Sequence, residues 1–216
     1  MSNGKSRATS LTHSLGMSPS TNARVARQVP RRQFTESTYR KAKPFLLRDF
    51  DGRCAYSLQH VKRVGYKGME VDHFNPRLRG LARNKYANLF PATRHCNGSK
   101  SDHWPSAAAR KSGIRFLNPC KEVDYGVHII EDPQTHMLVG MTPAGLYHIR
   151  CCDLNAPHLV QERHDRARLW EILDDCLITV RGSDALLDGS GMLEISTSLR
   201  AIVEKMIPPI LAAPVM

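Results

Sequence analysis

Residues 69–105 read MEVDHFNPRLRGLARNKYANLFPATRHCNGSKSDHWP, and this stretch decides the fold of the region around it. It opens with a short run of alternating apolar and polar residues that ends in the adjacent pair Asp72 and His73. Asn88 follows, and Asn97 opens N-G-S-K. Alternation of this kind predicts a half-buried β-strand. The sequence therefore places an acid and a histidine at a strand end, with two asparagines downstream.

These residue types fit the hydrolysis of a phosphodiester, which needs an activated water and neutralisation of charge. The Asp72 carboxylate and the Asn97 amide oxygen suit a hard cation such as Mg²⁺, or Mn²⁺ in its place. His73 can take a proton near neutral pH. Adjacent side chains of an ideal strand point to opposite faces, but the following Asn75-Pro76 indicates that the strand is already breaking there.

The D-H pair, N-L-F and C-N-x-x-K resemble the core of the HNH endonucleases, also called ββα-metal nucleases, over roughly residues 54–105. The tail C-N-G-S-K-S-D-H-W-P is also similar to the HNH domain of RNA-guided CRISPR nucleases. The resemblance implies that Asp72 and Asn97 bind one metal ion and that His73 activates water. It also implies that Asn88 holds His73 in position.

Three shorter motifs resemble a narrower group, the small HNH proteins of Septu-type bacterial anti-phage systems. They are R-F-L-N-P at 115–119, D-L-N at 153–155 and H-L-V-Q-E-R at 158–163. This resemblance implies a DNA-cutting defence nuclease that works with an ATPase partner. Two alternatives stay open: an HNH-type module that binds nucleic acid or a partner without cutting, and a nuclease that acts on RNA.

Cysteine spacing argues against the structural zinc that many HNH cores hold with two C-x-x-C pairs. Ser57 stands where Cys54 would need a partner, and Thr93 stands where Cys96 would need one. We therefore expect Cys54 and Cys96 to be small buried residues that face each other.

Charge is distributed unevenly along the chain, whose formal net charge is +11. Residues 1–115 hold 23 Lys and Arg against 6 Asp and Glu, whereas residues 116–216 hold 8 against 14. A basic half that contains the nuclease-like motif indicates a nucleic-acid partner, and the family resemblance implies that this partner is DNA. The candidate phosphate contacts are Lys62, Arg63, Arg77, Arg79 and Lys100.

We expect an α+β chain with a ββα-metal core in three parts: a disordered basic arm at 1–33, a nuclease core with a leading helix at 34–110, and an accessory region at 111–216. The arginines of the arm, among them Arg24 and Arg27, could hold DNA or a partner. The expected core elements are a helix at 38–50 with a kink or restart at Pro44, hairpin strands at 53–57 and 68–73, a loop or short turn at 84–89, and a helix at 96–104.

Beyond the core we expect a linker at 106–115, short strands and turns at 116–152, and helices at 158–175 and 193–207. The second helix could bind a partner or pack on the chain's own core. The sequence has no apolar run long enough for a membrane span and opens with no hydrophobic signal peptide, so we expect a cytoplasmic protein without a membrane partner.

Overall fold

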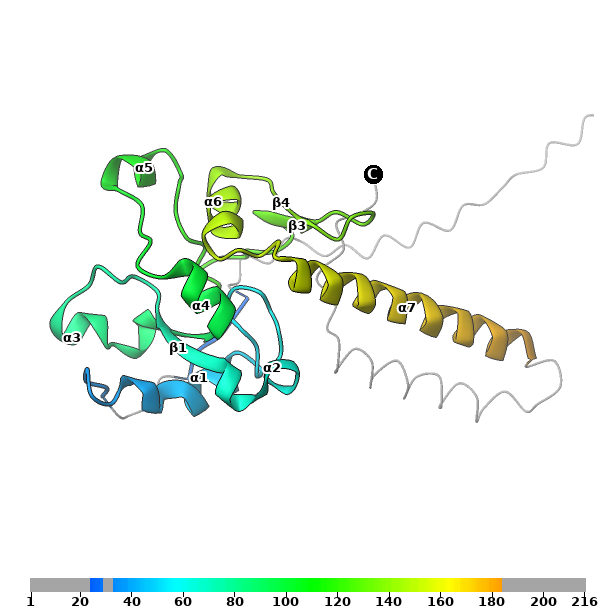
Figure 1. The fold of residues 1–216 in the computed structure, drawn as a ribbon, viewed down its shortest axis with the longest axis horizontal. Coiled ribbons are helices and arrows are strands. Elements are labelled where there is room, and N and C mark those ends of the chain that lie inside the picture. Colours follow the sequence, from blue (N-terminus) through cyan, green and yellow to red (C-terminus); the bar gives the residue numbers. More distant parts are fainter. Residues whose placement is uncertain (1–23, 29–32, 184–216) are drawn as a thin grey trace, which may run out of the picture.

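The computed structural model describes residues 24–28 and 33–183, with residues 173–183 as helix backbone only (Figure 1). It is an α+β structure with two small antiparallel sheets. The elements are η1 (Tyr39–Ala42), α1 (Lys43–Asp49), α2 (Val61–Gly68), β1 (Met69–His73), α3 (Gly80–Arg83), η2 (Tyr86–Asn88), β2 (Leu89–Thr93), α4 (Arg94–Lys100), α5 (Ala107–Lys111), β3 (Ile129–Glu131), β4 (Leu138–Gly140), α6 (Pro143–Cys151) and α7 (Pro157–Ser183).

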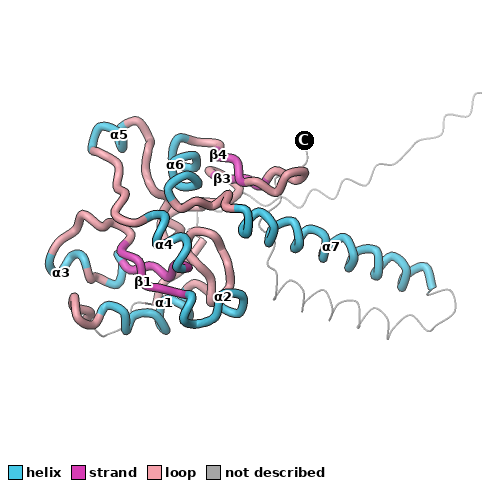
Figure 2. Tube along the Cα trace, viewed as in Figure 1, coloured by secondary structure: helices cyan, strands magenta, loops and turns pink. Residues whose placement is uncertain are grey.

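The first sheet pairs β1 with β2, in a register that sets Met69 opposite Thr93 and His73 opposite Leu89. Helix α4 follows β2 without a break and contacts both strands, while α1 contacts β2 (Figure 2). β1 ends at His73, just before Asn75-Pro76, as the sequence predicts. The order strand, strand, helix thus occupies the segment from Met69 to Lys100.

The second strand of this hairpin is not the expected segment 53–57, which forms only an isolated bridge between Arg53 and His60. The sequence misleads here because β2 carries Pro91, which cannot donate a hydrogen bond to a strand ladder. In the structure the Pro91 carbonyl accepts a 2.7 Å hydrogen bond from the Ala55 backbone N–H instead. Segment 53–57 therefore lies beside β2 as a turn.

Local signals explain the bounds of α4, which begins two residues before the expected start. The Thr93 side chain accepts a hydrogen bond from the Cys96 backbone N–H and caps the helix. The helix ends at Lys100 because Ser101 adopts a left-handed conformation with φ of 45°. Upstream, Pro44 lies in the first turn of α1, so it restarts the helix after η1.

The main hydrophobic core joins the two halves of the chain. Phe90 of β2, Tyr56 and Met69 share one buried cluster with Phe116 and with Ile149 of α6. A smaller cluster lies between α1 and the hairpin and is built from Phe34, Ala42, Leu46, Val71, Tyr86 and Leu89. Residues from the expected core and accessory regions thus pack together.

The accessory region differs from expectation in two places. Residues 107–111 of the expected linker form the short helix α5. The expected strands at 116–152 are confirmed for the hairpin β3–β4, but residues 143–151 form α6. Thr142 caps α6 through its side chain and Pro143 occupies the first turn, which are ordinary helix-start signals.

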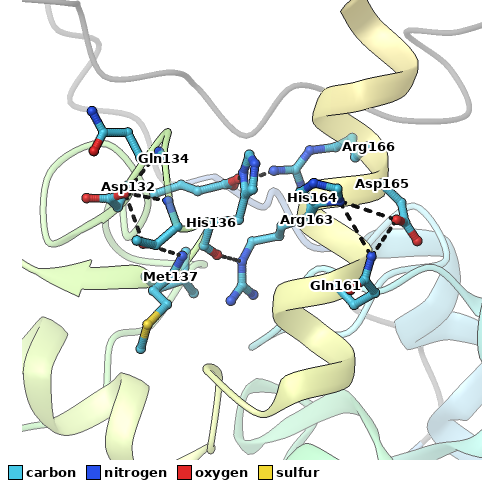
Figure 3. Close-up of polar contacts among 12 residues, drawn as sticks. Asp132, Gln134, His136, Met137, Gln161, Arg163, His164, Asp165 and Arg166 are labelled. Atoms are coloured by element: carbon cyan, nitrogen blue, oxygen red, sulfur yellow. Dashed lines mark hydrogen bonds and ion pairs between the residues drawn. The ribbon is translucent and has the colours of Figure 1, made fainter.

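Helix α7 is confirmed and is longer than expected, and its C-terminal part extends away from the other elements (Figure 1). Polar contacts fix its first turns to the β3–β4 hairpin (Figure 3). Nε of Arg163 donates a 2.6 Å hydrogen bond to the His136 carbonyl, and Arg166 pairs with Glu131. The expected helix at 193–207 lies outside the described residues.

The expected arm is ordered where the structure describes it. Arg24 forms a bidentate ion pair with Asp124 at 2.7 and 2.8 Å, and Asp124 is 1% exposed. Arg27 donates to the Leu89 carbonyl at 2.9 Å and lies over the Phe90 ring. These two arginines hold the chain together rather than facing a partner. In the described ranges no helix is both long and apolar enough to cross a membrane.

Candidate functional site

Asp72 lies in a buried polar cluster on the side of β1 that faces α4. Nζ of Lys100 lies 3.1 Å from Oδ1 and 2.9 Å from Oδ2 of Asp72, and it also donates to the His73 carbonyl at 3.1 Å. The Tyr56 hydroxyl donates to Oδ2. Burial and the Asp72 charge raise the pKa of Tyr56, so Tyr56 stays a donor. The carboxylate is neutralised within the protein.

Lys100 was expected to contact a phosphate, and the structure contradicts this. Its side chain is 0% exposed and its ammonium group is held by Asp72 and the His73 carbonyl. The reason is geometric: α4 is short and packs directly on β1, so its last turn points into the protein.

His73 has different neighbours from Asp72. Its Nε2 lies 2.9 Å from Oδ1 of Asn84, and its ring lies 4.6 Å from the Tyr39 ring. β1 extends through His73, so the two adjacent side chains leave on opposite faces of the strand. Burial is the main cause that lowers the pKa of His73, which favours a neutral imidazole at pH 7.

Asn88 does not hold His73, contrary to expectation. Its Oδ1 accepts from the Asn75 backbone N–H at 2.9 Å, and its Nδ2 donates to the carbonyls of Asn75 and Arg83. Asn88 therefore fixes the two ends of the loop between β1 and β2. Asn84 contacts the imidazole instead. The loop contains several asparagines, and nothing else in the sequence points to Asn84 rather than Asn88.

Asn97 lies on α4 and is linked to β1 through Glu70. Its Nδ2 donates to Oε2 of Glu70 at 2.7 Å, and Arg94 donates to the other oxygen at 3.2 Å. Glu70 was not among the expected site residues. Strand alternation could have found it, because residues 70 and 72 share a face of the strand.

The donor set of this face fits a hard divalent cation in its chemistry, since Asp72, Asn97 and Glu70 all present oxygen atoms. Both oxygens of Asp72 are already bonded, so a cation would have to take at least one of them from Lys100. Among the side chains described, no group of three or more His, Cys, Asp or Glu could hold a metal.

Cys54 and Cys96 are both buried in the main hydrophobic core, as expected for small core residues. Backbone N–H groups of Tyr56, Ser57 and Thr93 each point at the Cys54 sulfur at 3.4 Å. Burial opposes ionisation of Cys54, but the hydrogen bonds outweigh it and lower its pKa to about 6. The turn at Cys54 is thus held by sulfur as an acceptor.

The other expected phosphate contacts are exposed. The side chains of Arg63 and Arg77 are 63% and 57% exposed, and their nearest acids, Glu162 and Asp102, lie 3.9 and 3.8 Å away. Lys62 and Arg79 are also exposed. Exposed pairs at such distances contribute little, so these four cations are available to a partner.

A separate cavity of about 510 Å³ lies between residues 49–63 and the first turns of α7. Arg53, Arg163 and Arg166 line it together with Asp51 and Glu162. It includes neither Asp72 nor His73, and its acids and bases largely offset one another. The residues of the nuclease-like motif therefore lie outside this cavity.

In comparisons with known proteins, no family model matches the chain, and no curated protein or solved structure matches it. The class that the structure defines is an α+β protein with a strand-strand-helix unit.

Proposed function

We propose that the chain is a metal-dependent HNH-type endonuclease that hydrolyses DNA phosphodiester bonds. The observation that carries the proposal is that Asp72 and His73 lie at the end of β1, in a strand-strand-helix unit whose helix α4 carries Asn97. A strand end of this kind brings an acid, a neutral imidazole and the helix with Asn97 within one small region.

In this proposal Asp72 and Asn97 hold Mg²⁺ or Mn²⁺, and Glu70 is a third oxygen donor nearby. When bound there, such an ion would neutralise charge on the phosphate and stabilise the leaving oxygen. His73 accepts the proton of the attacking water. Because Asp72 and His73 leave β1 on opposite faces, both can act on one phosphate only at the strand end, where pairing with β2 stops.

DNA as the substrate class is supported by the basic half of the chain and by its exposed cations. Lys62 and Arg63 lie on α2, and Arg77 and Arg79 lie in the loop after β1. Contacts from such side chains give affinity without reading bases. RNA is the alternative polymer, and digestion of both side by side distinguishes them.

A role in anti-phage defence with an ATPase partner is the further part of this proposal, and it rests on resemblance. The motifs that carry the resemblance have structural partners here: Arg115 pairs with Glu122, and Arg163 donates to Asn155 at 3.1 Å. The exposed apolar side chains of α7, Leu169 and Ile172, are compatible with a protein partner.

One observation favours a second function, a binding module that does not cut. Lys100 and Tyr56 occupy the oxygens of Asp72, so the acid is satisfied without a metal. Such a module needs its exposed cations but no metal. Calorimetric titration with Mn²⁺ separates the two functions, because a pure binder shows no heat of metal binding.

The test incubates the full chain with plasmid DNA and with Mg²⁺, Mn²⁺ or EDTA. His73→Ala is compared with His158→Ala, which changes an exposed histidine of α7. We expect cutting that needs metal and His73 but not His158. Equal cutting by the two variants would remove His73 from the mechanism, and cutting in EDTA would remove the metal.

A further inference from the structure

The His73 imidazole is joined to two further side chains that belong to none of the nuclease-like motifs. Oδ1 of Asn84 lies 2.9 Å from Nε2 of His73, and Nδ2 of Asn84 donates to Oε2 of Glu36 at 3.1 Å. Asn84 is 5% exposed, whereas the Glu36 side chain is 68% exposed. The three residues form a linear chain of hydrogen bonds from the surface to the ring.

The carboxylate at the outer end sets the direction of every bond in this chain. An ionised carboxylate only accepts, so the Asn84 group that faces Glu36 must be its NH₂. The amide oxygen of Asn84 then faces His73, and it also only accepts. The hydrogen between them must therefore be on Nε2 of His73.

A neutral imidazole carries one N–H, so a hydrogen on Nε2 leaves the lone pair on Nδ1. In the described part of the chain Nδ1 makes no hydrogen bond. The Tyr39 ring, 4.6 Å from the imidazole, restricts rotation that would exchange the two nitrogens. The ring thus has one tautomer and one orientation.

We infer that Asn84 and Glu36 are positioning residues that hold His73 as the Nε2–H tautomer and leave Nδ1 as its only proton-accepting atom. The catalytic consequence rests on the proposed function. Water oxygen attacks phosphorus, its proton passes to Nδ1, and the P–O bond to the leaving oxygen breaks. The proton then returns from Nδ1 to the leaving oxygen or to solvent.

The surroundings of Glu36 support this assignment. Arg83, at the end of α3, places Nε 3.7 Å from the same Glu36 oxygen that Asn84 contacts. The hydrogen bond from Asn84 is the main cause that lowers the pKa of Glu36, so the carboxylate is ionised at neutral pH. Glu36 precedes η1, which means that a segment before the strand-strand-helix unit controls the imidazole.

The test is proton NMR of the His73 ring in the full, metal-free chain, together with steady-state cleavage. We compare the wild type with Asn84→Leu, Asn84→Asp and Glu36→Gln. Asn118→Leu is the control, because Asn118 is half-buried and, among the described residues, its side chain is hydrogen-bonded only to the Cys120 backbone N–H. Asp at position 84 keeps an acceptor for Nε2–H, whereas Leu removes it.

We expect a slowly exchanging Hε2 signal for His73 in the wild type, in Asn84→Asp and in the control, and its loss in Asn84→Leu. Cleavage by Asn84→Leu should fall by about 10–100-fold in kcat with KM unchanged, as for other residues that orient a ligand or base. Asn84→Asp should recover most of this rate, which a purely structural amide would not allow.

A His73 hydrogen on Nδ1 in the wild type, or an Hε2 signal that survives in Asn84→Leu, would overturn the inference. If Asn84→Leu does not fold, Glu36→Gln decides, because this exposed position tolerates the change and a glutamine no longer fixes the direction of the Asn84 amide. An unchanged Hε2 exchange rate in Glu36→Gln would contradict the role assigned to Glu36. If the wild type does not cut, the proposed function fails while the ring spectrum still decides the tautomer.

Discussion

The Lys100 ammonium group spans the Asp72 carboxylate, 3.1 Å from one oxygen and 2.9 Å from the other, and no part of Lys100 reaches solvent. This pair is a buried ion pair inside the strand-strand-helix unit. It connects the last residue of α4 to the end of β1, and through the His73 carbonyl it also fixes the backbone there.

Replacing Lys100 should show whether the Asp72 carboxylate can bind a metal ion in place of the ammonium group. We expect Lys100→Met to lower the free energy of unfolding by about 3–5 kcal/mol, because it leaves a buried carboxylate uncompensated. Added Mn²⁺ should restore part of this loss if Asp72 is a metal ligand. Urea unfolding with and without Mn²⁺ measures both effects. Lys121→Met, at an exposed lysine, is the control and should change neither the free energy of unfolding nor its response to Mn²⁺. If Mn²⁺ does not stabilise the Lys100→Met protein, this result argues against a metal at Asp72.

His148 of α6 should make the fold sensitive to mild acid. It is 1% exposed, and burial lowers its pKa to about 4. Between the unfolded pKa of about 6.5 and this value the unfolded chain binds a proton that the folded chain does not, so stability falls as pH falls. The loss should approach about 3 kcal/mol at pH 4. Urea unfolding from pH 7.5 to 4.5 should show this slope, and it should be reduced in His148→Phe, which keeps an aromatic ring beside Phe116.

Two N-terminal deletions should differ sharply. Removing residues 1–23 leaves the contacts of Arg24 and Arg27, whereas removing residues 1–33 eliminates them. We expect the longer deletion alone to destabilise the fold by several kcal/mol, because it leaves the buried Asp124 without its cation. Thermal unfolding measures the difference. Equal melting temperatures would mean that the Arg24–Asp124 pair adds no stability. In a separate measurement, the salt dependence of DNA binding by the shorter deletion reports on residues 1–23 alone.

The exposed cations near the site should control the salt dependence of DNA binding. Replacing Lys62, Arg63, Arg77 and Arg79 by alanine should weaken binding, and each lost phosphate contact should reduce the slope of log K against log salt by about 1. Fluorescence anisotropy with a short duplex at several salt concentrations measures this slope. A variant with Lys121 and Arg168 replaced, two exposed cations elsewhere, should retain it; equal slopes in the two variants would place the DNA on another face.

The sequence predicts the parts of the fold that depend on local chemistry. Alternation predicts β1, the Asn75-Pro76 break predicts its end, and mixed charges with an apolar stripe predict α7. Prediction failed where tertiary contacts override a local rule. Pro91 argues against a strand, yet β2 tolerates it because the Pro91 carbonyl faces Ala55 rather than β1.

In the candidate site, too, the sequence predicts what depends on local pattern and fails where tertiary packing decides. The pattern identifies Asp72, His73 and Asn97 as candidate site residues. The structure places Asp72 and His73 at the end of β1 and Asn97 on α4, where it contacts Glu70 near the start of the strand. The pattern could not tell that Lys100 is buried rather than exposed, since that follows from how closely α4 packs on β1. Nor could it choose Asn84 over Asn88, because both lie in one loop and only the path of the backbone brings one amide to the ring.

The side chain of Asn155 pairs with the backbone at the start of β4, in the β3–β4 hairpin. Its Oδ1 accepts from the Leu138 N–H at 2.7 Å and its Nδ2 donates to the Leu138 carbonyl at 2.9 Å, as a neighbouring strand would. An open strand edge is a template for pairing with another chain, and this edge is already paired at its first residue. The start of β4 is therefore closed to pairing with another strand, while the side chains of Val139 and Met141 stay exposed for contact with another protein.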